Sequence, residues 1–272
     1  MKKLAIFTGI VVFCVTALAA QNFKDGIYFA QDAKWAGNQK NQVVIEVKGG
    51  KITSVNFNTI GLSAGAKDLK TIAKAADAPA AVKNWATQVA AVEAHIVSSQ
   101  KTGNATVAGG PANTKDLLAL ANNAVSARNV QPVAKGSIPK DGWYYAEEAD
   151  GIEYEYHTRN TVLITVVNGT IVDTLWNGIL QGNYGRPQPS KYIVSMGNGY
   201  PMSDPPGPGI ARVTKDGRWE QQADRVSAEL VKVQNPASLK IRADGYTDAI
   251  SGVSMNIHHF AELAKQALAA AR

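Results

Sequence analysis

The chain has a single cysteine, Cys14, which lies among its first 20 residues. Those residues have the pattern of a leader that is removed on export, so the remaining chain would carry no thiol. Disulfide bonds, thiolate metal sites, iron–sulfur clusters and cysteine nucleophiles are thereby excluded from the expected mature protein. Any redox chemistry would need a bound cofactor.

Charge is also scarce. Only 18% of the residues are charged, and the formal net charge is +6, to which Lys2 and Lys3 of the leader contribute. The basic residues form no cluster interleaved with aromatic residues, which a nucleic-acid-binding face would require. We therefore expect no nucleic-acid partner, and the 45% hydrophobic content predicts a globular chain.

The signatures of several enzyme and metal sites are incomplete. The stretch GVSMN (252–256) approaches the hydrolase motif G-x-S-x-G, but Asn256 replaces the second glycine. His258 and His259 are adjacent, so on a helix they would point ~100° apart and make a poor chelating pair. No phosphate-binding loop of the Walker type occurs. We predict no catalytic residue and no metal site.

Residues 1–20, MKKLAIFTGIVVFCVTALAA, have the pattern of a signal peptide: two lysines, an apolar run and small residues before the cleavage point. The apolar run from Leu4 to Leu18 is shorter than the ~20 residues of a spanning helix, although a retained anchor stays an alternative. Phe13 is bulky where a lipoprotein signal has a small residue, which disfavours tethering through Cys14. We predict an exported protein, periplasmic or associated with the cell envelope.

The chain contains an internal repeat. KDGIYFAQDA (24–33) recurs as KDGWYYAEEA (140–149), and NQVVIEVKGGKITSVNFN (41–58) recurs as NTVLITVVNGTIVDTLWN (160–177). In the longer pair, apolar and polar residues alternate around a Gly-Gly or Asn-Gly pair, which predicts a β-hairpin with a tight turn. The apolar residues that would share one face of each hairpin are Val43, Ile45 and Val47, and Val162, Ile164 and Val166.

Amphipathic helices follow each hairpin. Apolar residues at spacings of three and four begin at Val82 and Trp85 in the first copy and at Trp219 in the second. The closing segments NTKDLLALANNAV (113–125) and NIHHFAELAKQAL (256–268) also match. We predict an α+β fold of two homologous domains, residues 22–130 and 138–272, each a small antiparallel sheet with a hairpin and packed helices. The segment from Asn129 to Pro139 has the place of a linker.

The repeat offsets rise from 116 to 134, so the second copy has gained 18 residues ahead of Trp219. We expect this insertion to fall within residues 182–209, a stretch that is rich in glycine and proline and holds Tyr184, Tyr192 and Tyr200. It is either an ordered surface loop or a lid over a ligand, because loops of this length are often functional.

The two copies differ most at the stretch DAISGVSMN (248–256), opposite which the first copy has ATVAGGPAN (105–113). Gly252 aligns with a glycine in the first copy, Gly109. The three polar residues align with non-polar ones: Asp248 with Ala105, Ser251 with Ala108 and Ser254 with Pro111. Groups that only held the fold together should be needed in both copies. Their loss from one copy points to a chemical role in the other.

Two interpretations of Ser254 follow from its place ahead of the last helix. Its oxygen could cap the helix, a contribution of ~1 kcal/mol. Alternatively, the unpaired N–H groups and the dipole of the helix would favour an anion, phosphate above all, with Gly252 allowing close approach of the backbone.

DAISGVS resembles the Asp-x-x-Ser-Gly-Ala-Ser/Thr signature of the FMN-binding domain family. That family occurs in exported electron-transfer proteins, including subunits of sodium-translocating quinone reductases and Gram-positive extracellular lipoproteins. In it, a flavin transferase moves FMN from FAD onto the final Ser or Thr hydroxyl and leaves a phosphoester. The resemblance implies that Ser254 is the attachment residue, with Asp248, Ser251 and Gly252 as the rest of the motif. Val253 stands where the family usually has alanine.

The resemblance further implies two tandem copies, the first degenerate and the second carrying covalent FMN. The expected protein is a redox carrier and a substrate of the transferase rather than a turnover enzyme. Its partners would be the flavin transferase and an envelope electron donor and acceptor, with a membrane-associated redox partner also compatible. Candidates for stacking on the flavin are Tyr184, Tyr192, Tyr200 and Trp176. The alternatives are a flavin-free binding or surface-interaction protein with a lapsed FMN-binding fold, and non-covalent ligand binding beneath the long loop.

Overall fold

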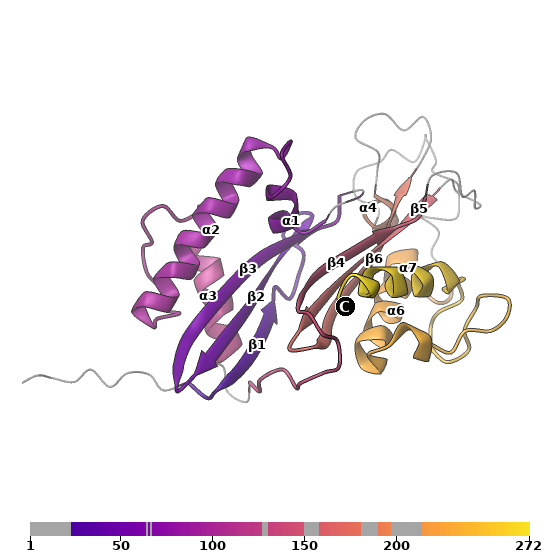
Figure 1. The fold of residues 1–272 in the computed structure, drawn as a ribbon. Helices are drawn as coiled ribbons and strands as arrows, with labels where there is room; N and C mark the ends of the chain where they lie inside the picture. The colour runs from indigo at the N-terminus through magenta and orange to yellow at the C-terminus, as the bar shows by residue number, and fades with distance from the viewer. Residues whose placement is uncertain are drawn as a thin grey trace, which may run out of the picture.

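A computed structural model of the chain describes residues 23–63, 65, 67–126, 130–149, 158–180, 190–196 and 214–272. The predicted signal peptide, Tyr184 and Tyr200 lie outside these residues, as does Asn129 at the start of the expected linker. The described chain forms two sheet-plus-helix units, which Figure 1 shows with their sheets facing each other and their helices on the outer sides.

The two units have matching orders of elements. The first consists of β1 (Gly26–Gln31), β2 (Gln39–Lys48), β3 (Lys51–Gly61), α1 (Leu69–Ala73), α2 (Ala80–Ser99) and α3 (Thr114–Val125). The second consists of β4 (Gly142–Glu147), β5 (Thr158–Val167), β6 (Thr170–Leu180), α4 (Lys191–Ser195), α6 (Trp219–Val233), the 3₁₀ helix η1 (Pro236–Ser238) and α7 (His258–Ala269). Each sheet is antiparallel, in the orders β1-β2-β3 and β4-β5-β6, and the predicted α+β fold is confirmed.

The predicted hairpins form because their turn residues accept a left-handed backbone. The Gly-Gly turn after β2 has φ angles of +59° and +71°, and the Asn-Gly turn after β5 has +52° and +72°. An acid just before the first strand of each unit holds the turn in place. Asp25 accepts hydrogen bonds from both turn N–H groups at 2.9 and 2.8 Å, and Asp141 does the same at 2.7 and 2.8 Å.

One face of each sheet packs on the helices of its own unit. The six alternating residues predicted to share these faces, Val43, Ile45 and Val47 in β2 and Val162, Ile164 and Val166 in β5, are all at most 1% exposed. In the first unit they pack with α2 and α3, and in the second with α6 and α7. The period-2 pattern therefore identified the core face correctly.

The opposite faces of the two sheets pack against each other. A separate buried cluster spans the units and contains Ile60 and Leu62 from the first together with Leu163, Leu175 and Tyr192 from the second. Gln42 of β2 is fully buried there. Its amide oxygen accepts from Trp143 at 2.6 Å and Thr165 at 3.1 Å, and its amide nitrogen donates to Asp173 at 2.7 Å. Because the polar atoms of a buried amide need hydrogen-bond partners, these bonds fix the position of one sheet on the other.

The segment between the units is bound along its length. Val133 donates its backbone N–H to the carbonyl of Ile27 in β1 at 2.7 Å, and Gly136 donates to the carbonyl of Asn168 in the β5–β6 turn at 2.8 Å. From residue 130 onward, the expected linker therefore connects the two sheets through backbone hydrogen bonds, and it does not act as a loose tether.

Candidate functional site

Ser254 lies in the turn that precedes α7, and its side chain is exposed. The helix itself begins at His258, and the N-cap residue Ile257 makes no side-chain capping bond. The first helical N–H is bonded instead by the Asn256 side chain, whose Oδ1 accepts from His258 at 2.9 Å. Capping is therefore the wrong interpretation of Ser254. The expectation that the serine sits directly at the helix terminus needs the same correction, since the chain makes a further turn between them.

The Ser254 hydroxyl is only weakly held. Its backbone N–H donates to Oε1 of Gln222 on α6 at 2.9 Å, and its hydroxyl reaches the same oxygen at 3.4 Å. A distance of 3.4 Å is well beyond the usual ~2.7–2.8 Å of an O–H···O bond. The backbone of the turn is thus fixed by Gln222, while the hydroxyl is accessible to other chemistry.

Gly252 shapes this turn and brings a cation beside it. Its φ of +73° is left-handed, a conformation that glycine adopts without strain. Arg225 of α6 packs on it, and its Nη1 donates to the carbonyl oxygens of Gly252 and Asp216, each at 2.6 Å. A Cβ atom on Gly252 would lie 3.0 Å from that nitrogen. Gly252, two residues before Ser254 in the chain, therefore both permits the turn and leaves room for the guanidinium.

The first unit builds the same turn without the polar side chains. Gly109, the counterpart of Gly252, has a φ of +75°. The turn closes by a hydrogen bond from Gly110 to the carbonyl of Val107 at 3.1 Å, matching the one in the second unit from Val253 to Ile250 at 3.3 Å. A Cβ atom on Gly109 would meet only Ala91 of α2, at 4.0 Å, where the second unit has Arg225. Neither the hydroxyls nor the arginine is needed to form this turn.

The other motif residues have distinct surroundings. Asp248 is exposed and pairs with Arg242, whose Nη1 lies 2.8 Å from its Oδ1, and Ser251 is exposed as well. Val253 is buried in the core of the second unit. The methyl groups that distinguish this valine from the alanine of the FMN-binding signature thus pack inward, away from the solvent that the Ser254 side chain faces.

Sequence reasoning missed Arg225 and Gln222, because each lies on α6, far along the chain from the DAISGVS stretch. A signal for Arg225 was present in the repeat: with Trp219 aligned to Trp85, Arg225 falls opposite Ala91. It therefore belongs with the polar residues that only the second copy carries.

Two of the residues predicted to stack on the flavin, Trp176 and Tyr192, lie away from Ser254. Trp176 is 3% exposed and packs edge-to-face on Trp219, with ring centroids 5.4 Å apart. Tyr192 is buried between the units and donates its hydroxyl to Asp224 of α6 at 2.8 and 2.9 Å. Burial raises the pKa of Tyr192. Since residues two apart on a helix point ~200° from each other, Asp224 and Gln222 lie on opposite flanks of α6, and Tyr192 is not brought together with Ser254.

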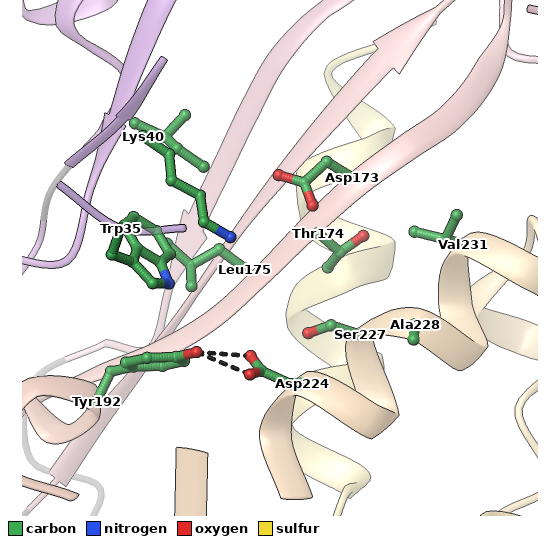
Figure 2. A pocket seen from close by; sticks show the side chains of 11 residues that line it. Trp35, Lys40, Asp173, Thr174, Leu175, Tyr192, Asp224, Ser227, Ala228 and Val231 are labelled. Atoms are coloured by element: carbon green, nitrogen blue, oxygen red, sulfur yellow. Dashed lines mark hydrogen bonds between the residues drawn. The ribbon is translucent and has the colours of Figure 1, made fainter. Parts of the chain in front are cut away.

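A cavity of about 320 Å³ lies on that opposite flank, between the two units (Figure 2). It is lined by Trp35, Lys40 and Ile60 of the first unit and by Asp173, Thr174, Leu175, Tyr192, Asp224, Ser227, Ala228 and Val231 of the second. The cavity and the Ser254 turn are therefore two separate features on either side of α6.

Charged groups are also partly buried beside Trp219. The Lys191 ammonium lies 4.6 Å from the centroid of the Trp219 ring, and burial lowers its pKa to about 8, against an opposing effect of Glu148. Glu148 lies 2.6 Å from Nδ1 of His259 on α7. Burial would raise the pKa of Glu148, but hydrogen bonds from His259 and Asn160 outweigh it, so the pKa is lowered overall.

Comparisons with known proteins add little to this description. No family model matches the chain, and no curated protein is significantly similar to it. Among solved structures, it is similar to the solution NMR structure of a protein from Clostridium thermocellum, determined by a structural genomics consortium, at 38% sequence identity. The similarity covers 49% of this chain and 92% of that one, with a TM-score of 0.37, which is too low to support any inference. Within the described residues, no helix is long and apolar enough to cross a membrane, and no three potential ligand side chains are grouped for a metal ion.

Proposed function

We propose that the protein is an exported electron-transfer protein of the FMN-binding type, which carries FMN through a phosphoester on Ser254. The observation that carries the proposal is the comparison of the two matching turns. Both have the left-handed glycine, but only the second has an exposed serine two residues further on and a guanidinium packed against the glycine. These polar groups are dispensable for the turn, so a role in chemistry is the better explanation of their presence.

The local residues fit a phosphate group. Both hydrogen bonds of Arg225 to the described residues use Nη1, whereas a guanidinium has five N–H donors in all. The remaining donors would bind phosphate oxygens, and arginine is well suited to this because charge-assisted bonds to phosphate are strong and directional. Positive charge near Ser254 thus comes from Arg225, and the N-terminus of α7 is not required for it.

Attachment would be a transfer reaction carried out by a flavin transferase with FAD as donor. The Ser254 oxygen forms a bond to the FMN phosphorus, the pyrophosphate bond of FAD breaks, AMP leaves, and the hydroxyl proton is taken up by the transferase or solvent. The flavin, when bound, would supply the redox chemistry. This chain would contribute an accessible oxygen, a fixed turn through Gln222 and Gly252, and charge compensation by Arg225. Its electron donor and acceptor would be other components of the cell envelope.

The proposal is tested by co-producing the full chain with a flavin transferase and measuring the intact mass. We expect one FMN per chain in the wild type and in Ser254→Thr, and none in Ser254→Ala. Arg225→Ala should lower the modified fraction without unfolding the protein, because the side chain is exposed. As a matched control, Pro111→Ser places a hydroxyl at the same point of the first unit, where Ala91 replaces the arginine, and should gain no second FMN.

An unmodified wild-type chain would refute the proposal, provided that a known substrate is flavinylated in the same cells. It would then favour the flavin-free binding protein as the alternative. Modification of the wild type that persists in Ser254→Ala would place the flavin on another residue and would refute the assignment to Ser254.

A further inference from the structure

The cavity between the two units is lined by buried hydroxyl groups that form no hydrogen bond with the described part of the chain. Thr174 of β6 and Ser227 of α6 are 7% and 6% exposed, and neither hydroxyl oxygen forms a hydrogen bond to any of the described residues. Both line the cavity (Figure 2). Leaving a buried polar group without a hydrogen-bond partner is destabilising, so two of them lining one cavity indicate that a ligand supplies their partners.

In the first unit, larger side chains occupy the position that corresponds to this cavity. With Trp219 aligned to Trp85, Ser227 falls opposite Glu93. Helix α4 matches α1, so Tyr192, the second residue of α4, is not part of the inserted residues but corresponds to Lys70, the second residue of α1. The side chains of Glu93 and Lys70 form an ion pair of 2.6 Å. Glu93 also accepts from the backbone N–H of Phe57 at 2.7 Å. The second unit has the short side chain of Ser227 where the first has Glu93. The cavity therefore results from a difference in side-chain size between two units of the same fold.

Unlike charges face each other across the cavity. Lys40 projects from the first unit, where its ammonium lies 4.6 Å from the centroid of the Trp35 ring. Asp173 and Asp224 project from the second unit, and Lys40 forms no ion pair with either among the described residues, although its charge lowers the pKa of both. Burial has the larger effect on both carboxyl groups, so the pKa of Asp173 and the pKa of Asp224 are each raised overall. Charges held apart in a partly enclosed site favour a ligand that compensates each of them.

We propose that this cavity binds a small zwitterion, such as a free α-amino acid. Asp224 and Asp173 would bind the ammonium group, Lys40 would bind the carboxylate, and the Thr174 and Ser227 hydroxyls would complete the hydrogen bonding. At about 320 Å³ the cavity is near the small end of ligand pockets, which span roughly 300–1,000 Å³. The Trp35 and Tyr192 rings supply apolar surface for a side chain. This site is independent of the flavin proposal, because it lies on the other flank of α6.

The site is tested by isothermal titration of the full chain with the common L-amino acids, one at a time. Propionate, ethylamine and glucose serve as probes that carry only the negative charge, only the positive charge, or no charge. We expect at least one amino acid to bind with one site per chain and the three probes to bind at least tenfold more weakly. Lys40→Gln and Asp224→Asn should each weaken binding at least tenfold, whereas Lys51→Gln, at an exposed lysine of the same unit, and Ser254→Ala should not.

A further variant copies the filled first unit. Ser227→Glu should abolish binding because its carboxylate would occupy the hollow as Glu93 does, and circular dichroism would verify that each variant is folded. The proposal is overturned if no amino acid binds, if any of the single-charge or neutral probes binds as tightly, or if folded Lys40→Gln and Asp224→Asn bind like the wild type.

Discussion

The two left-handed glycines provide a matched pair of perturbations, Gly109→Ala and Gly252→Ala. An alanine at either position must adopt a φ near +75° or +73°, which costs ~1–2 kcal/mol for an L-residue. At position 109 the new methyl group meets only Ala91 at 4.0 Å, an ordinary contact. At position 252 it would lie 3.0 Å from Nη1 of Arg225. The guanidinium must then shift by a few tenths of an ångström, which weakens its bond to the carbonyl of residue 252, a further loss of ~1 kcal/mol at this exposed site.

We therefore expect Gly109→Ala to lower the free energy of unfolding by ~1–2 kcal/mol and Gly252→Ala by ~2–3 kcal/mol. Urea unfolding followed by circular dichroism measures both values. The extra loss should disappear when both glycine variants are compared in an Arg225→Ala background, because the crowded group is then absent. Equal losses with Arg225 present, or a difference that survives its removal, would show that the Gly252–Arg225 contact is not as described.

Two further outcomes are expected. Because burial lowers the pKa of Lys191 from 10.5 to about 8, the unfolded chain binds more protons between these values, and stability should rise as pH increases from about 8 to about 10.5. Lys191→Met should reduce that rise in pH-dependent urea titrations, and an unchanged profile would contradict the burial of this ammonium. Separately, Ile45→Ala and Ile164→Ala each truncate a fully buried side chain and should cost ~2–5 kcal/mol. Since the units share a buried interface, calorimetry should show one common transition shifted by either variant, and two independent transitions would argue against that coupling.

Much of the fold was predictable because its signals are local. Alternation of apolar residues around Val43 and Val162, and glycine or asparagine pairs between the strands, determine hairpins through backbone geometry alone. Apolar spacings of three and four gave the long helices in the same way. The repeat adds a comparison that no single motif supplies, and that comparison singles out Ser254.

The candidate site was only partly predictable. The DAISGVS stretch indicated the residues of the turn, but the distance from Ser254 to the start of α7 depends on how Asn256 bonds to His258, which the spacing of residues does not reveal. Arg225 and Gln222 reach the turn from α6, which is distant in the sequence. Their side chains are positioned by the packing of α6 on β6 and by the turn that Gly252 permits.

The sequence by itself determined two similar α+β units, the faces of their sheets, and the turn at which one unit kept polar groups that the other lost. Only the tertiary structure decided that the sheets pack face to face, that Arg225 lies beside Gly252, and that a cavity lined by the Thr174 and Ser227 hydroxyls lies between the units. The physical reason is the range of the interactions. Backbone conformation and periodicity act between near neighbours in the chain, whereas the contacts of Gln42, Lys40 and Asp224 exist only once two separately encoded surfaces have been packed together.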